Sequence, residues 1–189
     1  MSSKSDLESI ARAAYDIGFG AKKHFATFDA VEKLPGWVGF ISFSIGVFAL
    51  IHEPLAKKFV SATLVVAGMS VIYLAVYRSA DYEKAGKALT DIYHELAALH
   101  TQAMNGGFRG SISDKVSECR RRAQDVSISR QLFLADWWAH YKFFGQQQTG
   151  WIEAELGLTW RDKWPASLRF TMSAAAISAI AAAAYYWSS

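Results

Sequence analysis

Charged residues are frequent along most of this chain but are absent from three segments. These segments run from Leu34 to Ile51, from Phe59 to Tyr77 and from Phe170 to Trp187. A soluble helical domain interleaves charges with apolar positions instead of separating them in this way. The first two segments have about the length that crosses a bilayer core roughly 30 Å thick, and the short stretch between them predicts a turn. We therefore predict a transmembrane helical hairpin over residues 34–77, the alternative being a buried helical hairpin in a soluble core.

Residues 1–33 precede this hairpin and carry apolar residues at helical spacing. The pattern Ser-Asp-Leu-Glu at residues 5–8 is typical of a capping box that opens a helix. A second short helix is predicted over residues 21–33. These two juxtamembrane helices either pack on the cytoplasmic body or lie on the bilayer surface. Pro35 fits the first turn of the next helix, where its missing N–H costs nothing.

Residues 78–169 are predicted to form a cytoplasmic helical body. Apolar residues recur there at alternating intervals of four and three, which is the spacing of a heptad seam. The seam consists of Ala85, Leu89, Ile92, Leu96, Leu99 and Ala103. We expect the second transmembrane helix to continue through this seam as one long rod, and the seam to pack on the next helix of the same chain rather than on a second copy.

Two further helical stretches are predicted in the body. One runs from Asp114 to Phe144 and the other from Gly150 to Trp160. The first contains Trp137 and Trp138, for which core packing is the simpler expectation and a belt at the membrane surface is the alternative.

The third charge-free segment consists mainly of Ala and is therefore only weakly hydrophobic. Aromatic residues flank it, as in the belts of membrane helices: Trp164 precedes it, and Tyr185, Tyr186 and Trp187 close it. We predict a third transmembrane helix over residues 170–189, the alternative being a helix buried against the body.

The predicted fold class is thus an all-α membrane protein. A transmembrane helical hairpin continues into a cytoplasmic helical bundle, and a third transmembrane helix ends the chain. The predicted parts are residues 1–33, 34–77, 78–169 and 170–189.

The cations are distributed unequally around the apolar segments. Of the 20 Lys and Arg residues, 18 lie before the hairpin or between the second and third segments, and two, Lys57 and Lys58, lie in the turn. Cytoplasmic loops carry the excess of cations, so the N-terminus and the body are predicted to be cytoplasmic. The formal net charge of +3 is too small to indicate DNA or RNA as a partner.

No motif predicts catalysis, a cofactor or a metal. His94 and His100 bracket a sequence similar to that of zinc proteases, but they are six residues apart and a shared metal needs a spacing of four. The glycine-rich residues 105–110 lack the Lys-Ser/Thr pair of a phosphate loop. Cys119 is the one cysteine of the chain and is expected to be an unreactive thiol.

Small residues form a candidate face within the two transmembrane segments. Such faces either pack two helices closely within the hairpin or line a narrow path between subunits. The residues are Gly39, Ser42, Gly46 and Ala49 in the first segment and Thr63, Ala67 and Ser70 in the second. Neither segment contains Asp, Glu, Lys, Arg or His, which argues against an ion-coupled pump or transporter.

The body also carries a set of candidate arginines. Their guanidinium groups could contact a phosphate ligand, anionic lipid headgroups or acidic neighbouring helices. The residues are Arg109, Arg120, Arg121, Arg122 and Arg130.

The order of these parts resembles the SLATT family of two-span effectors associated with bacterial nucleotide-second-messenger defence systems. The resemblance rests on Trp37, the tight hairpin, residues 77–84 (Tyr-Arg-Ser-Ala-Asp-Tyr-Glu-Lys) and the following helix with Leu89, Tyr93 and Leu96. It covers roughly residues 7–150, and the third apolar segment departs from its two-span pattern.

The resemblance implies a homo-oligomeric, membrane-disrupting or pore-forming effector in the bacterial inner membrane. Such a protein would act in an abortive-infection type of anti-phage system and stay inactive until signalled by a cyclic oligonucleotide or a nucleotide-sensing protein partner. Two alternatives remain open: a non-toxic scaffold or accessory subunit that docks a soluble partner, and a small constitutive channel.

Overall fold

The computed structural model describes residues 3–188, and the side chains of residues 3–180. These residues are all-helical, with seven α-helices, two short 3-10 helices and no strand. This confirms the predicted all-α class. The elements are α1 (Lys4–Ala49), η1 (Glu53–Ala56), α2 (Lys58–Leu74), α3 (Ser79–Met104), α4 (Ile112–Val126), α5 (Ala135–Gln146), α6 (Gly150–Leu156), η2 (Trp160–Lys163) and α7 (Ala166–Ser188).

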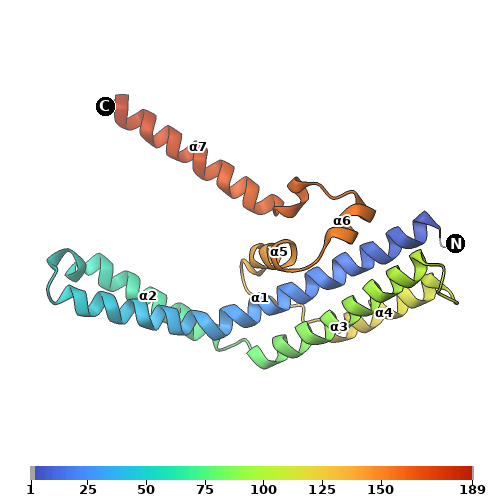
Figure 1. Cartoon of the computed structure of the whole chain (residues 1–189). Helices are drawn as coiled ribbons and strands as arrows, with labels where there is room; N and C mark the ends of the chain where they lie inside the picture. The colour runs from blue at the N-terminus through green and yellow to red at the C-terminus, as the bar shows by residue number, and fades with distance from the viewer. Residues whose placement is uncertain (1–2, 189) are drawn as a thin grey trace.

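Helix α1 is continuous over 46 residues and runs from the body to the turn of the hairpin (Figure 1). The predicted division into two short helices before the hairpin is wrong, because nothing between Ala11 and Thr27 interrupts the buried face of α1. The capping box also starts two residues earlier than predicted. The Ser3 hydroxyl accepts a hydrogen bond from the Asp6 backbone N–H (3.2 Å), and the Asp6 carboxylate accepts one from the Ser3 N–H (3.0 Å).

Pro35 lies inside α1 and not in a first turn, contrary to the prediction. Proline cannot donate to the carbonyl four residues earlier, which costs about 3 kcal/mol in a helix interior. The helix continues past it because both flanks are supported. The preceding part of α1 packs on the body, and the following part packs on α2.

The core of the body forms between α1 and α3, which run side by side in Figure 1. All six residues of the predicted seam on α3 are buried, so the seam packs within the chain, as predicted, but mainly on the preceding helix and not on the next one. Its main partner is α1, with α4 as the second partner. Phe143 from α5 and Ile152 from α6 close the same core and are fully buried.

Helices α2 and α3 do not form one rod, and that prediction is wrong. They are bent by 60° at the break between Leu74 and Ser79. Leu74 and Tyr77 are buried at this corner. The Tyr77 ring lies 6.1 Å from the ring of Tyr82, and the Arg130 guanidinium lies 5.0 Å above it. Burying these rings against the body requires the chain to turn there.

The predicted helix from Asp114 to Phe144 is also interrupted. Helices α4 and α5 are separated by residues 127–134, which we name the elbow. Leu134 adopts a left-handed conformation with φ 67°, which an α-helix does not accommodate and which non-glycine residues rarely adopt. The Ser127 hydroxyl bonds back to the Ala123 carbonyl at 2.7 Å, competing with helix continuation as Ser side chains do.

Buried polar groups of α1 hold the elbow in place. The Ile128 N–H donates to His24 Nε2 at 2.9 Å, while His24 Nδ1 lies 2.7 Å from the Gly20 carbonyl oxygen. This pair of contacts fits a neutral His24 protonated on Nδ1. The Thr27 hydroxyl donates to Gln131 Oε1 at 2.7 Å. Because His24 and Thr27 are buried, these bonds position the elbow firmly on α1.

Helix α7 leaves the body on the side from which the hairpin projects (Figure 1). Phe170, Met172, Ile177 and Ile180 are exposed, so this part of α7 is not buried against the body. Near the start of α7, the Trp137 indole N–H donates to the Ser167 hydroxyl at 3.0 Å. The side chains of Tyr185, Tyr186 and Trp187 lie outside the described residues.

Among the described residues, no helix taken alone is both long and apolar enough to cross a bilayer. By length and composition, the bent pair α2 and α3 qualifies when joined. Ala166–Ile180 is a shorter apolar helix.

Gly18 provides a test of the packing of α1. A Cβ atom there would lie 2.8 Å from Tyr93 Cδ2 and 2.9 Å from Phe143 Cε2. Overpacking costs about 1–3 kcal/mol, whereas replacing a helical glycine by alanine gains about 1 kcal/mol. Gly18→Ala should therefore lower the free energy of unfolding, measured in detergent, by about 1 kcal/mol. Gly20→Ala is the matched control, because its Cβ would lie 3.9 Å from Leu89 Cδ1, and it should be neutral or stabilising. Equal stabilisation by both changes would contradict this packing.

The buried, neutral state of His24 can be tested by the dependence of folding stability on pH. Burial lowers the pKa of His24, and the nearby Lys23 acts in the same direction, whereas the hydrogen bond to Gly20 opposes them. The unfolded chain then binds this proton at a higher pH than the folded chain. The stability contributed by neutral His24 is therefore fully present above about pH 6.5 and is lost as the pH falls through the lowered folded-state pKa.

The measurement is thermal unfolding at about pH 7.5 and about pH 5.5. His24→Gln should be less stable than wild type at the higher pH but should lose less stability on acidification. A smaller pH dependence remains, because burial also lowers the pKa of His140. His52→Gln, in the exposed turn, should keep the wild-type dependence. The same pH dependence in His24→Gln and wild type would show that His24 is not the titrating group.

Candidate functional site

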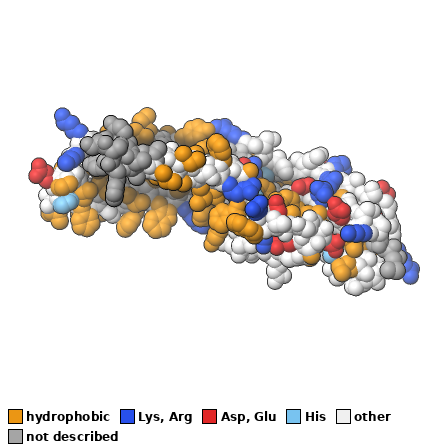
Figure 2. Space-filling model, turned by 90° about the horizontal axis from the view of Figure 1, so that it is seen from above, with side chains coloured by type: hydrophobic (Ala, Val, Ile, Leu, Met, Phe, Trp, Pro, Cys, Tyr) orange, Lys and Arg blue, Asp and Glu red, His pale blue; other side chains and the backbone are white. Residues whose placement is uncertain are grey.

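The hairpin, residues 34–77, exposes large apolar side chains along its whole length. Exposed fractions reach 72% for Phe43, 85% for Leu50 and 81% for Phe59. Figure 2 shows hydrophobic side chains gathered over this half of the molecule, whereas cations and anions are mixed over the other half. Monomeric soluble proteins rarely expose apolar patches larger than a few hundred Å². The hairpin therefore needs a cover that the rest of the described chain does not supply.

The predicted small residues fall into two groups on this hairpin. Ser42, Ala49 and Ala67 are half-buried, whereas Gly39, Gly46, Thr63 and Ser70 are exposed. The two exposed hydroxyls bond to their own helix, since Thr63 donates to the Phe59 carbonyl and Ser70 to the Val66 carbonyl, both at 2.9 Å. Their polarity is thus satisfied without a partner helix.

A shallow groove of about 430 Å³ runs between α1 and α2. Gly39 and Ser42 line it from α1, and Gly68 lines it from α2. A Cβ atom added to Gly39 or Gly68 would meet nothing within 4 Å, so the groove is open. Gly68 was not singled out from the sequence, although it is the one glycine in α2. Small residues on both walls let another helix approach the backbone closely.

The predicted arginines do not converge on one site. Arg122 makes two hydrogen bonds of 2.8 Å to the Glu95 carboxylate, joining α4 to α3. This contact raises the pKa of Arg122 and lowers that of Glu95. Arg121 lies 3.8 Å from Asp125 on its own helix. For these two residues, acidic neighbours are the observed partners.

The other three arginines of that set lie apart from one another. Arg130 stacks over Tyr77 at the corner between α2 and α3. Arg109 is exposed in the connection after α3, and Arg120 is exposed on α4. The structure therefore brings no two of these three side chains together around a cavity.

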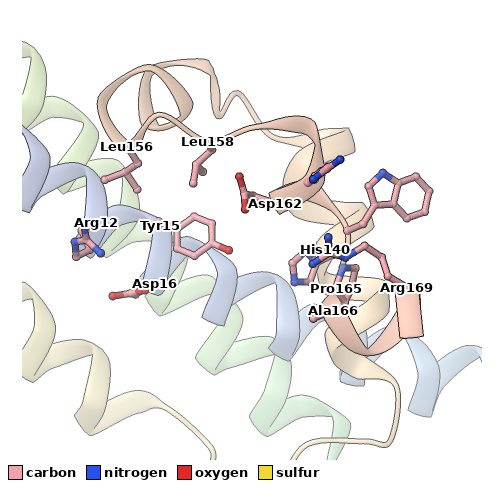
Figure 3. Close-up of a pocket in the computed structure, with 12 residues that line it drawn as sticks. Arg12, Tyr15, Asp16, His140, Leu156, Leu158, Asp162, Pro165, Ala166 and Arg169 are labelled. Atoms are coloured by element: carbon pink, nitrogen blue, oxygen red, sulfur yellow. The ribbon is translucent and has the colours of Figure 1, made fainter. Parts of the chain in front are cut away.

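A different set of charged side chains lines a cavity of about 410 Å³ between α1, α5 and the start of α7 (Figure 3). Arg12 lies toward one end and Arg169 toward the other, with Tyr15, Asp16 and Asp162 between them. Burial raises the pKa of Asp16, although Arg120 and Arg12 oppose this shift. Hydrogen bonds from Thr159 lower the pKa of Asp162.

This cavity has mixed charge, which limits what it can bind. Arg161 also lines it, so three guanidinium groups face two carboxylates. An anion entering the cavity would be attracted by the arginines and repelled by Asp162. Sequence reasoning missed this cluster because its members are spread from residue 12 to residue 169 and share no motif.

Burial also raises the pKa of the Cys119 thiol. Cys119 is fully buried, and a thiol in such surroundings is unreactive. This agrees with the expectation from the sequence.

One comparison with known proteins identifies a family. A family model described as "SMODS and SLOG-associating 2TM effector domain 6" matches residues 1–172. No curated protein and no solved structure matches the chain.

The match includes the body and the whole hairpin and ends within α7. Two transmembrane segments in the family description fit the two charge-free segments of the hairpin, and they imply a membrane protein. The chain belongs to the SLATT family of SMODS and SLOG-associating 2TM effector domains.

Proposed function

We propose that this protein is an oligomeric effector that permeabilises the bacterial inner membrane in an anti-phage, abortive-infection type of response. The observation that carries the proposal is the hairpin, which is apolar, free of charged residues over both helical segments and exposed on its outer surface. The family description as an effector domain with two membrane segments supports it.

The dimensions of the hairpin are at the lower limit for crossing a bilayer. Helix α2 has 17 residues, which corresponds to about 25 Å, against about 30 Å for a hydrocarbon core. Leu50 and Ile51 extend the apolar surface beyond the end of α1. A short apolar span is accommodated by local thinning of the bilayer, which itself weakens the membrane around an assembly.

The charges set the proposed topology. Lys57 and Lys58 lie in the turn, whereas the body carries most of the cations. Because cytoplasmic segments hold the excess of Lys and Arg, the body and the N-terminus lie in the cytoplasm, and the turn lies outside.

The proposed mechanism is a passive leak through an assembly. The two apolar segments contain no Asp, Glu, Lys, Arg or His, the side chains that usually form a proton relay or an ion-coupling site. A second copy would supply the helix that fills the groove between Gly39 and Gly68. The body would hold the assembly inactive until a cue arrives, which we propose to be a cyclic oligonucleotide or a nucleotide-sensing protein partner. No enzymatic step is part of this proposal.

The groove provides the first test. Gly39→Leu and Gly68→Leu should fill it without affecting the monomer, because both positions have open space. We expect a smaller oligomeric fraction after crosslinking in membranes. Strong expression should drive assembly by mass action even without the cue. A membrane-potential dye should then show a smaller depolarisation for these variants than for the wild type, by about tenfold if the contact is worth about 1.4 kcal/mol.

Gly36→Leu is the matched control. Gly36 lies on the same helix and is equally open, but it does not line the groove. It should leave oligomerisation and depolarisation at the wild-type level, with equal amounts of each variant in the membrane. If all three variants behave like wild type, assembly does not use this groove. Harmless expression of the wild-type chain would instead favour a scaffold.

The topology provides a second test. In a Cys119→Ala background, His52→Cys places a thiol in the turn, and Met104→Cys places one at the far end of α3, where Met104 is 63% exposed. A membrane-impermeant maleimide added to spheroplasts should label position 52 before lysis and position 104 only after lysis. The reverse order would show that the proposed orientation is inverted.

A further inference from the structure

The elbow presents apolar side chains to the outside at the base of the hairpin. Phe133 is 85% exposed, Leu134 is 44% exposed and Trp138, at the start of α5, is 52% exposed. Core packing was the simpler expectation for the tryptophans of this segment. For Trp138 that expectation is wrong, because the break before α5 turns this part of the chain outward.

These residues and α1 enclose an apolar groove of about 510 Å³, which we name the elbow groove. One wall consists of Leu34 and Trp37 from α1, and the other of Leu132, Phe133 and Trp138. Lys33 and Asp29 lie on its lining, and Asp29 is already paired with Lys33 and Lys142. The free surface of the groove is therefore predominantly apolar.

The elbow groove is continuous with the hairpin. Leu34 and Trp37 belong to the first charge-free segment, and Trp37 is 61% exposed. Exposed cations lie near the end of the hairpin that joins the body. They are Lys33 on α1, Arg78 at the corner and Arg130 on the elbow. Aromatic rings and cations at one level, next to an apolar span, are the arrangement found at the headgroup region of a bilayer.

The outward position of Phe133 is fixed by the fold. His24 and Thr27 of α1 hold the elbow by hydrogen bonds. Lys142 pairs with Asp29, and Lys23 pairs with Asp136 at 2.8 Å, so α5 is also tied to α1. The left-handed conformation of Leu134 carries a cost of about 1–3 kcal/mol. Exposing the apolar side chain of Phe133 is unfavourable in water. The firmly held elbow exposes it in spite of this and of the cost of the Leu134 conformation.

We propose that the elbow is a lipid-docking element. Phe133 and Leu134 insert at the boundary between headgroups and acyl chains of the bilayer that the hairpin crosses, and acyl chains occupy the elbow groove. Lys33 and Arg130 contact the phosphates of the same lipids. This inference rests on the proposed membrane insertion of the hairpin. Lipid is the occupant, and not a second copy, because the groove opens onto the hairpin surface at the level of Trp37 and the cations.

A spin-label depth measurement tests this proposal on the full chain. The chain carries Cys119→Ala and one of three further changes, Phe133→Cys, Val66→Cys or Met104→Cys. It is reconstituted into vesicles of phosphatidylcholine and phosphatidylglycerol. All three positions are at least 63% exposed, so labelling should not disturb the fold. Collision rates with oxygen report lipid, and those with a water-soluble nickel complex report water.

Position 66, on α2, is the lipid reference, and position 104, on α3 at the far end of the body, is the water reference. We expect the ratio of oxygen to nickel collision rates to be several-fold higher at position 133 than at position 104, and closer to the value at position 66.

The outcomes separate the two proposals. If position 66 reports lipid and position 133 reports water, the elbow proposal is wrong and the hairpin proposal stands. If position 133 is shielded from both oxygen and nickel, a protein surface covers the groove and lipid is not the occupant. If position 66 reports water, the hairpin is not inserted and both proposals fail.

Discussion

The packing of α1 against α3 is the contact on which the rest of the structure depends. Over its first half, α1 presents a row of alanines that are almost fully buried, among them Ala11, Ala14 and Ala21, together with Gly18. These small residues let large side chains from other helices reach the helix backbone. Tyr93 and Phe143 both lie against Gly18. Because close-packed interiors tolerate little change in volume, this face fixes where α3 and α5 lie.

Once α3 is placed on the first half of α1, the other elements follow. Helix α2 has to return along the second half, and the chain must turn at Tyr77 to pass from one to the other. Helix α4 is joined to α3 by Arg122 and Glu95. The elbow is then held by His24 and Thr27 on the side of α1. The apolar second half of α1 is left with α2 and η1 as neighbours.

Features that depend on composition over a long segment could be predicted from the sequence. The charge-free segments located both helices of the hairpin, and the heptad spacing located the buried face of α3, from Ala85 to Ala103. Helix ends were less predictable, because they depend on tertiary contacts. The turn at Tyr77 buries aromatic rings against the body, and Leu134 adopts its left-handed conformation in a segment that is held by α1.

The candidate site was also only partly predictable from the sequence, because its geometry depends on tertiary contacts. Gly39 and Ser42 were identified from their spacing, but the opposite wall at Gly68 depends on how α2 is rotated against α1. The charge of Arg122 was evident, but its pairing with Glu95, 27 residues earlier in the chain, was not. The cavity between Arg12 and Arg169 joins the two ends of the chain, and no local pattern encodes such a meeting.

The continuity of α1 also has a mechanical consequence. At 46 residues it is about 70 Å long, and it belongs to the body at one end and to the hairpin at the other. Because α1 is continuous, a small tilt of the body displaces the turn of the hairpin sideways by a larger distance. Pro35 removes one backbone hydrogen bond near the boundary between the two halves of α1. It is therefore the point where α1 bends most easily. Its position sets how much of a movement of the body reaches the turn of the hairpin.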